Sequence, residues 1–437
     1  MTPNSLKTYC VKVIRKVVMG AGLLLTVASL LSPTWWGADA SGFNRRSEEV
    51  DNSLFVNEQK LTASDGSAFD EFGNSVAFSG SSMVVGAPDG VDGNPDQGSA
   101  YVFNRQGGAW VEEQKLTASD GAADNFFGWS VAISDSTIVV GAWPDDIGSN
   151  ADQGSAYVFN RVGGSWIETQ KLTASDGTVG DHFGWSVAVS GSTIIVGALS
   201  DKIGANFFQG SAYVFNRHGE SWVETQKLTG SDGRRFDQFG WSVALSDSTV
   251  LVGATGSLFQ GAAYVFNRRG GKWVEEQKLI ASDGGTSDEF GWSVAVSGST
   301  IVVSAISTNQ FELQGSAYVF IRRGGSWIEE QKLDASDGAE FDEFGYSVAI
   351  SGSTIVVSAP GDDAVDGSPA QGSAYVFNRE GGVWIETQKL TASDGAAGDF
   401  FGKAVAVNGS TVVVSSLNDT IGPIFSHGSV YVFNRNR

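Results

Sequence analysis

The chain has 437 residues, of which 41% are hydrophobic, and it carries 28 Lys and Arg against 49 Asp and Glu, a net charge of −21 at pH 7. This negative charge disfavours nucleic acid as a partner, because binding to a phosphate backbone depends on clustered basic residues. The length alone suggests about two or three domains, but internal repeats predict a single array instead.

The N-terminal segment has the layout of a secretory signal peptide. Basic residues precede an apolar run from Val17 to Leu31, and Ala38-Asp39-Ala40 follows as a small-x-small cleavage site. The run has 15 residues, fewer than the roughly 20 that span a bilayer, and the alternative is a retained membrane anchor. We therefore expect a signal peptide over residues 1–40, a linker over 41–53, and a mature chain that is secreted or held at the cell surface with no stable membrane span after cleavage.

The mature chain, from about Ser41, would contain no cysteine, because the only one, Cys10, lies within the expected signal peptide. Its folding therefore cannot depend on disulfides, although export is compatible with such a composition. Cleavage also removes four basic residues and Asp39, which leaves 24 Lys and Arg against 48 Asp and Glu, a net charge of −24.

From residue 54 onward the chain repeats itself. The tripeptide Gln-Lys-Leu recurs at spacings of 55, 56, 56, 51, 54 and 57 residues. It begins at Gln59, Gln114, Gln170, Gln226, Gln277, Gln331 and Gln388. A period of this length is typical of a solenoid, a propeller or another array, and the content of each unit decides which.

Each unit contains four short segments rich in Val, Ile, Tyr, Phe and Trp, which predicts four β-strands. The first follows Phe-Gly, as in residues 72–77, and the second is a β-branched run such as residues 138–140. The third reads Gly-Ser-Ala-Tyr-Val-Phe-Asn-Arg or a close variant, and the fourth reads Trp-Val/Ile-Glu-x-Gln-Lys-Leu. Tight turns join the first strand to the second and the third to the fourth. Seven such meanders predict an all-β, seven-bladed propeller over residues 54–437.

Ring closure is also predicted. The seventh unit ends just after its third strand, residues 429–434, and an isolated copy of the fourth strand stands at the start, residues 54–61. We expect this N-terminal strand to supply the outer edge of the seventh blade, so that the first and last units are locked together.

The recurrent Phe-Gly and the single Gly86-Ala87-Pro88 resemble the FG-GAP repeat family, whose best-known members are the β-propeller heads of integrin α subunits. The sequence is most similar to the bacterial extracellular type, over Leu54 to Arg435. The resemblance implies a non-enzymatic binding or adhesion module for a protein or glycan. Integrin-type repeats bind calcium in the hairpin between strands one and two. Here that hairpin has only a few residues, such as Ser79-Gly80-Ser81, too short for the about six to eight oxygens that calcium takes.

A different acidic pattern precedes each Phe-Gly. It consists of the pairs Asp65 and Asp70, Asp120 and Asp124, Asp176 and Asp181, Asp232 and Asp237, Asp283 and Asp288, Asp337 and Asp342, and Asp394 and Asp399. Two carboxylates with glycine between them can hold a loosely coordinated Ca²⁺ with help from backbone carbonyls. The alternative is that each Asp closes its own turn by accepting nearby amides. Calcium is the one cofactor that the sequence suggests.

A residue type found in every blade cannot mark one place, so Phe72, Gly73 and their copies are expected to be structural. The tryptophans one step after Phe-Gly are expected in the core between blades rather than in a sugar-stacking ring; they are Trp129, Trp185, Trp241 and Trp292. The three histidines lie in different units, and no nucleophile or metal motif is recognisable. A polysaccharide-active enzyme with an acidic site and a purely structural envelope protein are the alternative functions.

The strand order predicts two different faces. The tight hairpins collect Arg105, Arg161, Arg217, Arg268, Arg269, Arg322, Arg323, Arg379 and Arg435, whereas the opposite face collects the paired aspartates and carries the long loops.

A partner site is expected where the repeats differ, and the loop between strands two and three varies most. Blades one, two and six are acidic there, with Asp89, Asp92, Asp96, Asp145, Asp146, Asp152, Asp362, Asp363 and Asp366. Blades three to five carry Phe207, Phe208, Leu258, Phe259, Phe311 and Leu313. These apolar side chains form either a ligand-binding patch or a seal folded onto the propeller.

Overall fold

The computed structural model describes residues 54–90, 94–246, 248–256, 260–307, 314–363 and 369–435. Residues 50–437 form one compact unit. The expected signal peptide and linker lie outside the described residues, and within these residues no helix is long and apolar enough to cross a membrane.

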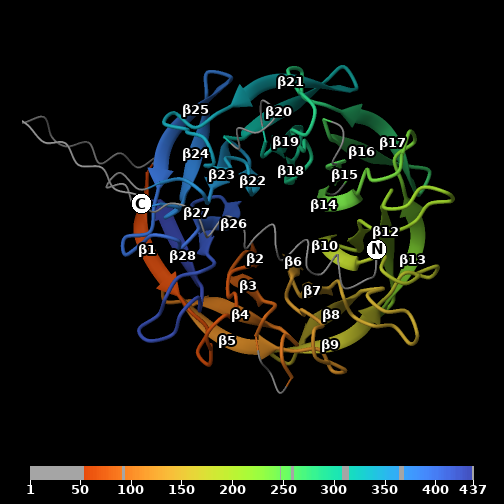
Figure 1. Ribbon diagram of the computed structural model, residues 1–437, viewed down its shortest axis with the longest axis horizontal. Helices are drawn as coiled ribbons and strands as arrows, with labels where there is room; N and C mark the ends of the chain where they lie inside the picture. The colour runs from red at the N-terminus through yellow and green to blue at the C-terminus, as the bar shows by residue number, and fades with distance from the viewer. Residues whose placement is uncertain are drawn as a thin grey trace, which may run out of the picture. The chain divides into compact units, whose positions relative to one another are not determined.

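The described strands form seven four-stranded antiparallel sheets arranged as blades of a ring (Figure 1). The innermost strands are β2 (Ser75–Ser79), β6 (Ser130–Ser134), β10 (Phe183–Ser190), β14 (Phe239–Ser246), β18 (Val294–Ser297), β22 (Val348–Ser351) and β26 (Phe401–Asn408). The second strands are β3 (Ser82–Ala87), β7 (Thr137–Ala142), β11 (Thr193–Ala198), β15 (Thr249–Ala254), β19 (Thr300–Ala305), β23 (Thr354–Ala359) and β27 (Thr411–Ser416). The predicted all-β, seven-bladed propeller is confirmed.

The two outer positions of each blade hold longer strands. The third strands are β4 (Ser99–Gln106), β8 (Ser155–Val162), β12 (Ser211–His218), β16 (Ala262–Arg269), β20 (Ser316–Arg323), β24 (Ser373–Glu380) and β28 (Ser429–Arg435). The outermost strands are β5 (Ala109–Leu116), β9 (Ser165–Leu172), β13 (Ser221–Leu228), β17 (Lys272–Leu279), β21 (Ser326–Leu333), β25 (Val383–Leu390) and, for blade seven, β1 (Phe55–Leu61).

The predicted ring closure is confirmed by the sheet of blade seven. Its strand order is β1-β28-β27-β26, and β1 runs antiparallel to β28 with Leu61 opposite Val430. The side-chain amide of Gln388 in blade six exchanges two hydrogen bonds, both 2.8 Å long, with the backbone of Phe55. The first strand of the chain therefore completes the last blade and also binds the blade before it.

Every blade is tied to the next by the same amide link. Gln114, for example, donates from its side chain to the carbonyl of Trp166 at 2.7 Å and accepts from the amide of Trp166 at 2.8 Å. The glutamines that make this link are Gln59, Gln114, Gln170, Gln226, Gln277, Gln331 and Gln388. The glutamine of the recurrent Gln-Lys-Leu tripeptide therefore links each blade to the next by hydrogen bonds.

The apolar core lies between adjacent blades. One cluster contains Val84, Val102 and Leu116 of blade one together with Phe127 and Ile138 of blade two, all almost fully buried. Phe127 meets Tyr157 and Phe159 edge to face, with centroid distances of 5.3 and 6.0 Å, an arrangement that aromatic rings favour. The phenylalanine of Phe-Gly therefore fills the space between blades, as predicted.

The glycines of the repeat permit close backbone approach. A Cβ on Gly141 would lie 2.1 Å from the carbonyl oxygen of Gly184 in the next blade, and Gly184 itself has a φ of 95°. Both positions exclude larger residues at this geometry. The phrase Phe-Gly is thus part of the scaffold.

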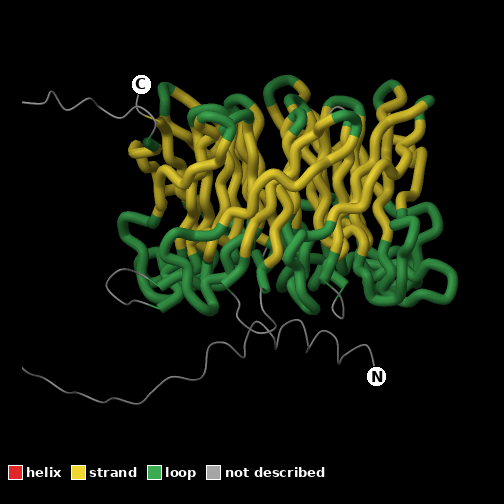
Figure 2. The backbone as a smooth tube through the Cα atoms, turned by 90° about the horizontal axis from the view of Figure 1, so that it is seen from above, coloured by secondary structure: helices red, strands yellow, loops and turns green. Residues whose placement is uncertain are grey.

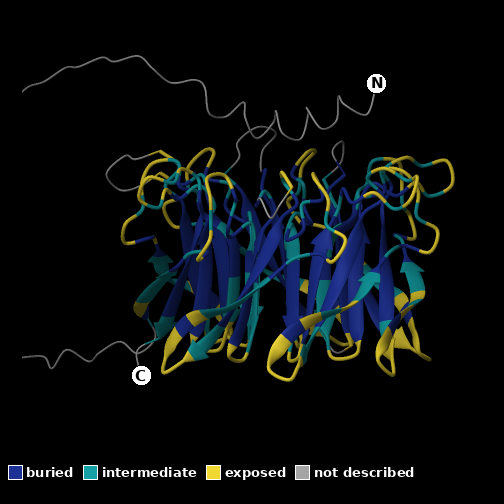
Figure 3. Ribbon diagram, turned by 90° about the horizontal axis from the view of Figure 1, so that it is seen from below, coloured by how far each residue is buried: buried dark blue, intermediate teal, exposed yellow. Residues whose placement is uncertain are grey.

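Two unlike faces result from this strand order (Figure 2). The tight hairpins lie at one end. At the other end, here called the long-loop face, lie two kinds of loop: those that enter the innermost strands and those that join the second strand of a blade to the third. At the hairpin end several arginines bridge blades, as in Arg161 to Glu113 at 2.5 Å and Arg379 to Glu330 at 2.9 Å. Exposed residues concentrate at both ends, while the strands are largely buried (Figure 3).

Candidate binding surface

The first aspartate of each pair is bound by a tyrosine and a lysine. In blade two, Tyr157 donates to Asp120 at 2.8 Å and Lys171 donates to the same carboxylate at 2.6 Å. Desolvation opposes ionisation of Asp120, but the hydrogen bonds from Lys171 and Tyr157 outweigh it and hold the pKa below its ordinary value. The same arrangement recurs at Asp65, Asp120, Asp176, Asp232, Asp283, Asp337 and Asp394.

A further aspartate joins this arrangement in four blades. Asp145, for example, is almost fully buried and lies 2.7 Å from Lys171, and it accepts from Ser155 at 2.5 Å and Tyr157 at 3.0 Å. Its counterparts are Asp201, Asp362 and Asp419. The structure thus places Asp145 and Asp362, two ligand candidates from the acidic loops, inside the scaffold.

Sequence reasoning did not single out Asp201 or Asp419. The signal that finds them is positional, because each stands four residues after the Gly or Ser near the end of the second strand, as Asp145 does after Gly141. The lysines bound to these carboxylates also lie on the long-loop face, which is therefore less negative than the aspartates alone suggest.

The second aspartate of the pair closes its own turn in most blades. Asp70 accepts the Ser67 amide at 2.5 Å, and Asp342 accepts the Ala339 amide at 2.6 Å. Asp181, Asp237, Asp288 and Asp399 accept in the same way. Burial raises the pKa of Asp342 to about 6, although the amide hydrogen bond opposes the shift. The turn interpretation of these residues thus matches the geometry.

Blade two departs from the expected pairing. The position two residues before Phe127 is occupied by Asn125, which is buried and donates to Asp145 at 3.1 Å, whereas Asp124 is exposed. Within the described residues, no group of three or more His, Cys, Asp or Glu side chains is arranged to hold a metal ion. Calcium binding by the paired aspartates stays a hypothesis.

The tryptophans after Phe-Gly form a half-buried belt along the innermost strands. Trp185 lies 4.9 Å from Trp129 and 5.2 Å from Trp241, measured between ring centroids, and Trp241 lies 4.7 Å from Trp292. The rings contact one another across blades, but the prediction that they lie in the core between blades is wrong, because all four are half-buried and none belongs to the fully buried inter-blade clusters. In the last blade Lys403 takes this position and donates to Tyr346 at 2.7 Å.

Carboxyl groups of blade one gather beside this belt. Desolvation, with the charges of Glu71, Asp96 and Asp70, raises the pKa of Asp89 to about 8. Burial also raises the pKa of Glu71, although the charge of Lys403 opposes that shift.

The remaining candidates lie in the loops between the second and third strands. Asp146 and Asp363 are exposed and accept backbone amides of Asp152 and Ala370, both at 2.9 Å, while Asp152 and Asp96 are half-buried. Phe207 is 47% exposed, and Phe208 is half-buried and stacks on Phe236 with centroids 5.6 Å apart. Outside the described residues lie Asp92, Leu258, Phe259, Phe311, Leu313 and Asp366.

Three exposed phenylalanines on the long-loop face were not predicted. Phe69, Phe341 and Phe425 are 63, 57 and 67% exposed, and the first two adopt φ angles of 69° and 74°. Such angles are unfavourable for bulky residues. For Phe69 and Phe341 the signal in the sequence is an aromatic residue three positions before Phe-Gly, where blades three and seven have glycine. Phe425 lies instead three residues before Gly428, in the loop between β27 and β28, as Phe207 does before Gly210 in blade three.

The geometry defines a class of protein: a repeat propeller whose recurrent polar residues join the blades and whose long loops differ from blade to blade. Seven copies of the FG-GAP repeat match residues 55–103, 110–159, 166–215, 222–266, 273–320, 327–377 and 384–433. Because these matches cover most of the chain, the protein belongs to the FG-GAP repeat family. No curated protein is significantly similar to the chain in sequence.

Proposed function

We propose that the protein is exported and acts, at the cell surface or beyond it, as a non-enzymatic binding or adhesion module for an extracellular protein or glycan. One observation carries this proposal. Among the described phenylalanines, the exposed ones are Phe69, Phe207, Phe341 and Phe425, and all four lie in loops of the long-loop face. Aromatic rings exposed together on one end of a protein are typical of interaction surfaces, since they bury large areas on binding.

The fate of the recurrent residues supports the same proposal. The repeated Gln, Tyr, Lys and Asp side chains already bond to one another or to backbone groups, so they hold the ring together. The residues that differ between blades lie in the long loops, and loops held by a rigid scaffold are the segments that usually carry function. FG-GAP propellers are, as a family, binding or structural modules.

The proposal is tested with immobilised mature protein, residues 41–437, probed with glycan arrays and with cell-surface extracts. The variant Phe207→Ser/Phe425→Ser is expected to lose captured ligands. A matched control, Val162→Ser/Val383→Ser, removes side chains that are 56 and 53% exposed at the tight-hairpin end, and it should retain them. Equal capture by both variants would contradict a role for the exposed phenylalanines, and capture by neither variant nor the parent protein would favour the purely structural alternative.

A polysaccharide-active enzyme is the second candidate, favoured by the raised pKa of Asp89 beside Glu71 and Asp96. A carboxyl group that keeps its proton near neutral pH can act as a general acid. Release of oligosaccharides from a polysaccharide panel by the parent protein, and its loss in Asp89→Asn, would replace the binding proposal. No product from either protein would remove this candidate.

Export is tested by sequencing the N-terminus of the protein recovered outside the cell. Cleavage after Ala40 would give a chain that begins at Ser41. Residues 1–40 retained on the exported protein would instead support a membrane anchor.

A further inference from the structure

The junction of blades three and four carries cations that no other junction has. Lys202 lies in the loop between β11 and β12, and Arg235 lies in the loop between β13 and β14. At the position of Arg235 the other blades have Ala68, Ala123, Val179, Thr286, Glu340 and Ala397. At the position of Lys202 they have Val91, Asp146, Leu258, Asn309, Asp363 and Thr420. A binding site that is present in one place only must be built from residues that do not recur at the same position in the other blades. This junction is therefore a candidate binding site.

Aromatic rings hold both cations in place. The Nζ atom of Lys202 lies 4.5 Å from the centroid of the Phe207 ring, and the guanidinium of Arg235 lies 5.5 Å from Phe207 and 4.6 Å from Phe236. The Phe236 amide donates to the Phe207 carbonyl at 3.0 Å, which joins the two loops. Cations fixed over rings lose less conformational entropy when they bind a ligand.

These two cations have no acidic partner within the part of the chain that the structure describes. No carboxylate there lies within 4.0 Å of Lys202 or Arg235, and both side chains are exposed. The lysines at the ends of the outermost strands, in contrast, are paired with aspartates. The chain carries a net charge of −21, which repels anionic ligands in general. An unpaired pair of cations is therefore a place on its surface where an anion is attracted at short range.

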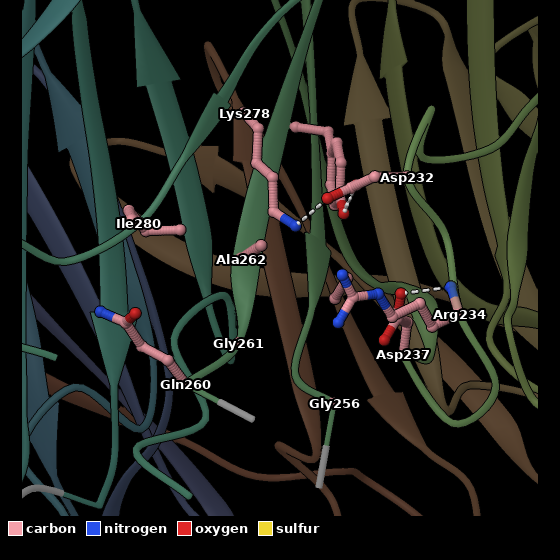
Figure 4. A pocket seen from close by; sticks show the side chains of 11 residues that line it. Asp232, Arg234, Asp237, Gly256, Gln260, Gly261, Ala262, Lys278 and Ile280 are labelled. Carbon is pink, nitrogen blue, oxygen red and sulfur yellow. Dashed lines mark hydrogen bonds and ion pairs between the residues drawn. The ribbon is translucent and has the colours of Figure 1, made fainter. Parts of the chain in front are cut away.

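A pocket of about 240 Å³ in blade four is lined by Arg234, the chain neighbour of Arg235 (Figure 4). The loop that carries Arg235 also provides Asp232 and Asp237 to the pocket wall, and Lys278 points from β17 toward Asp232 at 2.7 Å. Lys278 contacts a single carboxylate among the described residues, whereas Lys171 and Lys227 contact two each. A wall that contains two cations, Arg234 and Lys278, together with carboxylates and Gln260 suits a ligand with both hydroxyl groups and negative charge.

We infer that this junction binds a linear anionic polysaccharide of the polyuronate type, with the ligand carboxylates on Lys202 and Arg235 and a sugar ring at the pocket of Lys278. The inference rests on the proposed binding function. A folded acidic protein fits less well, because its larger footprint would meet the acidic loop of the adjacent blade two, which carries the exposed Asp146. A thin, flexible chain can follow the junction and avoid that loop.

Calorimetric titration of the mature protein with an oligogalacturonate tests the inference, with a neutral maltooligosaccharide and an oligoglutamate of equal charge as the other ligands. We expect the oligogalacturonate to bind best and more weakly as salt increases. Lys202→Gln/Arg235→Gln should weaken binding about tenfold, since each exposed ion pair contributes modestly. The control Arg268→Gln/Lys272→Gln removes the same charge from exposed positions at the tight-hairpin end, and it should change affinity less than about twofold.

Equal losses in the two double variants, or no binding of the oligogalacturonate, would overturn the inference. Oligoglutamate that binds as tightly as the oligogalacturonate would overturn it in favour of an acidic peptide. If the glycan fails to bind while Phe207→Ser/Phe425→Ser still loses captured ligands, the proposed binding function stands and only the polyuronate assignment fails. If neither assay detects a ligand, both proposals fail.

Discussion

Replacing one lysine of the recurrent Tyr-Asp-Lys arrangement should have very different effects in blades two and four. Lys171 lies 2.6 Å from Asp120 and 2.7 Å from Asp145, and the Asp145 side chain is only 5% exposed. Lys278 lies 2.7 Å from Asp232, whose side chain is 46% exposed. The two lysines occupy the same place in the repeat, so they form a matched pair of test positions.

The magnitudes follow from burial. Lys171→Met leaves Asp145 buried without a cation, and breaking a buried ion pair costs about 3–5 kcal/mol. We expect the lower end, about 3 kcal/mol, because Lys171 is itself 24% exposed and Ser155 and Tyr157 still donate to Asp145. Lys278→Met breaks a pair that water already screens, which costs about 0–1 kcal/mol.

Guanidinium unfolding followed by tryptophan fluorescence measures this difference in the free energy of unfolding. Adding Asp145→Asn to Lys171→Met should recover part of the loss, because a neutral amide needs no cation. Equal destabilisation by Lys171→Met and Lys278→Met, within about 0.5 kcal/mol, would refute the idea that the buried carboxylate sets the cost.

Three further predictions concern the ring, pH and calcium. Deleting residues 54–61 removes β1 and should lower the thermal midpoint by many degrees, and a deletion variant as stable as the parent would contradict closure of the ring. The pKa of Asp89 is raised to about 8, so the folded protein keeps a proton that the unfolded chain releases above a pH of about 4. The free energy of unfolding should therefore fall as the pH rises between these two values, and it should fall less in Asp89→Asn. Identical pH profiles of the two proteins would refute this. The aspartates held by lysine have lowered pKa values, so their stabilisation is lost only as the pH falls below about 4. Because the repeated carboxylates already bond to lysine, tyrosine or amide groups, millimolar calcium and magnesium should raise the thermal midpoint equally at equal ionic strength, and a larger effect of calcium would support calcium binding by the paired aspartates.

The architecture could be predicted from the sequence because the same pattern of strand segments and turns recurs in seven units. The period, the four β-rich segments and the unpaired fourth strand at residues 54–61 together required a closed ring. Ring closure needed no side-chain detail, since a strand left over at one end and missing at the other defines the pairing of β1 with β28.

The roles of individual side chains were harder to predict because they depend on local backbone geometry. Asp145 appears in the sequence as one of several loop aspartates, and only its backbone position between Tyr157 and Lys171 makes it buried. Trp185 was expected in the core, but the register of β10 shifts between Phe183 and Ser186. Such an irregularity changes which way the intervening side chains point, and alternation along a strand cannot reveal it.

We propose that blade-specific loops of the long-loop face bind an extracellular polysaccharide chain. Hydrogen exchange of the mature protein with and without saturating oligogalacturonate tests it most directly, because backbone amides report where a ligand lies. We expect slower exchange in residues 199–209 and 231–238, and unchanged exchange in the tight hairpins at residues 161–166 and 217–222. Protection confined to those hairpins, spread evenly over seven blades, or detected nowhere would contradict it.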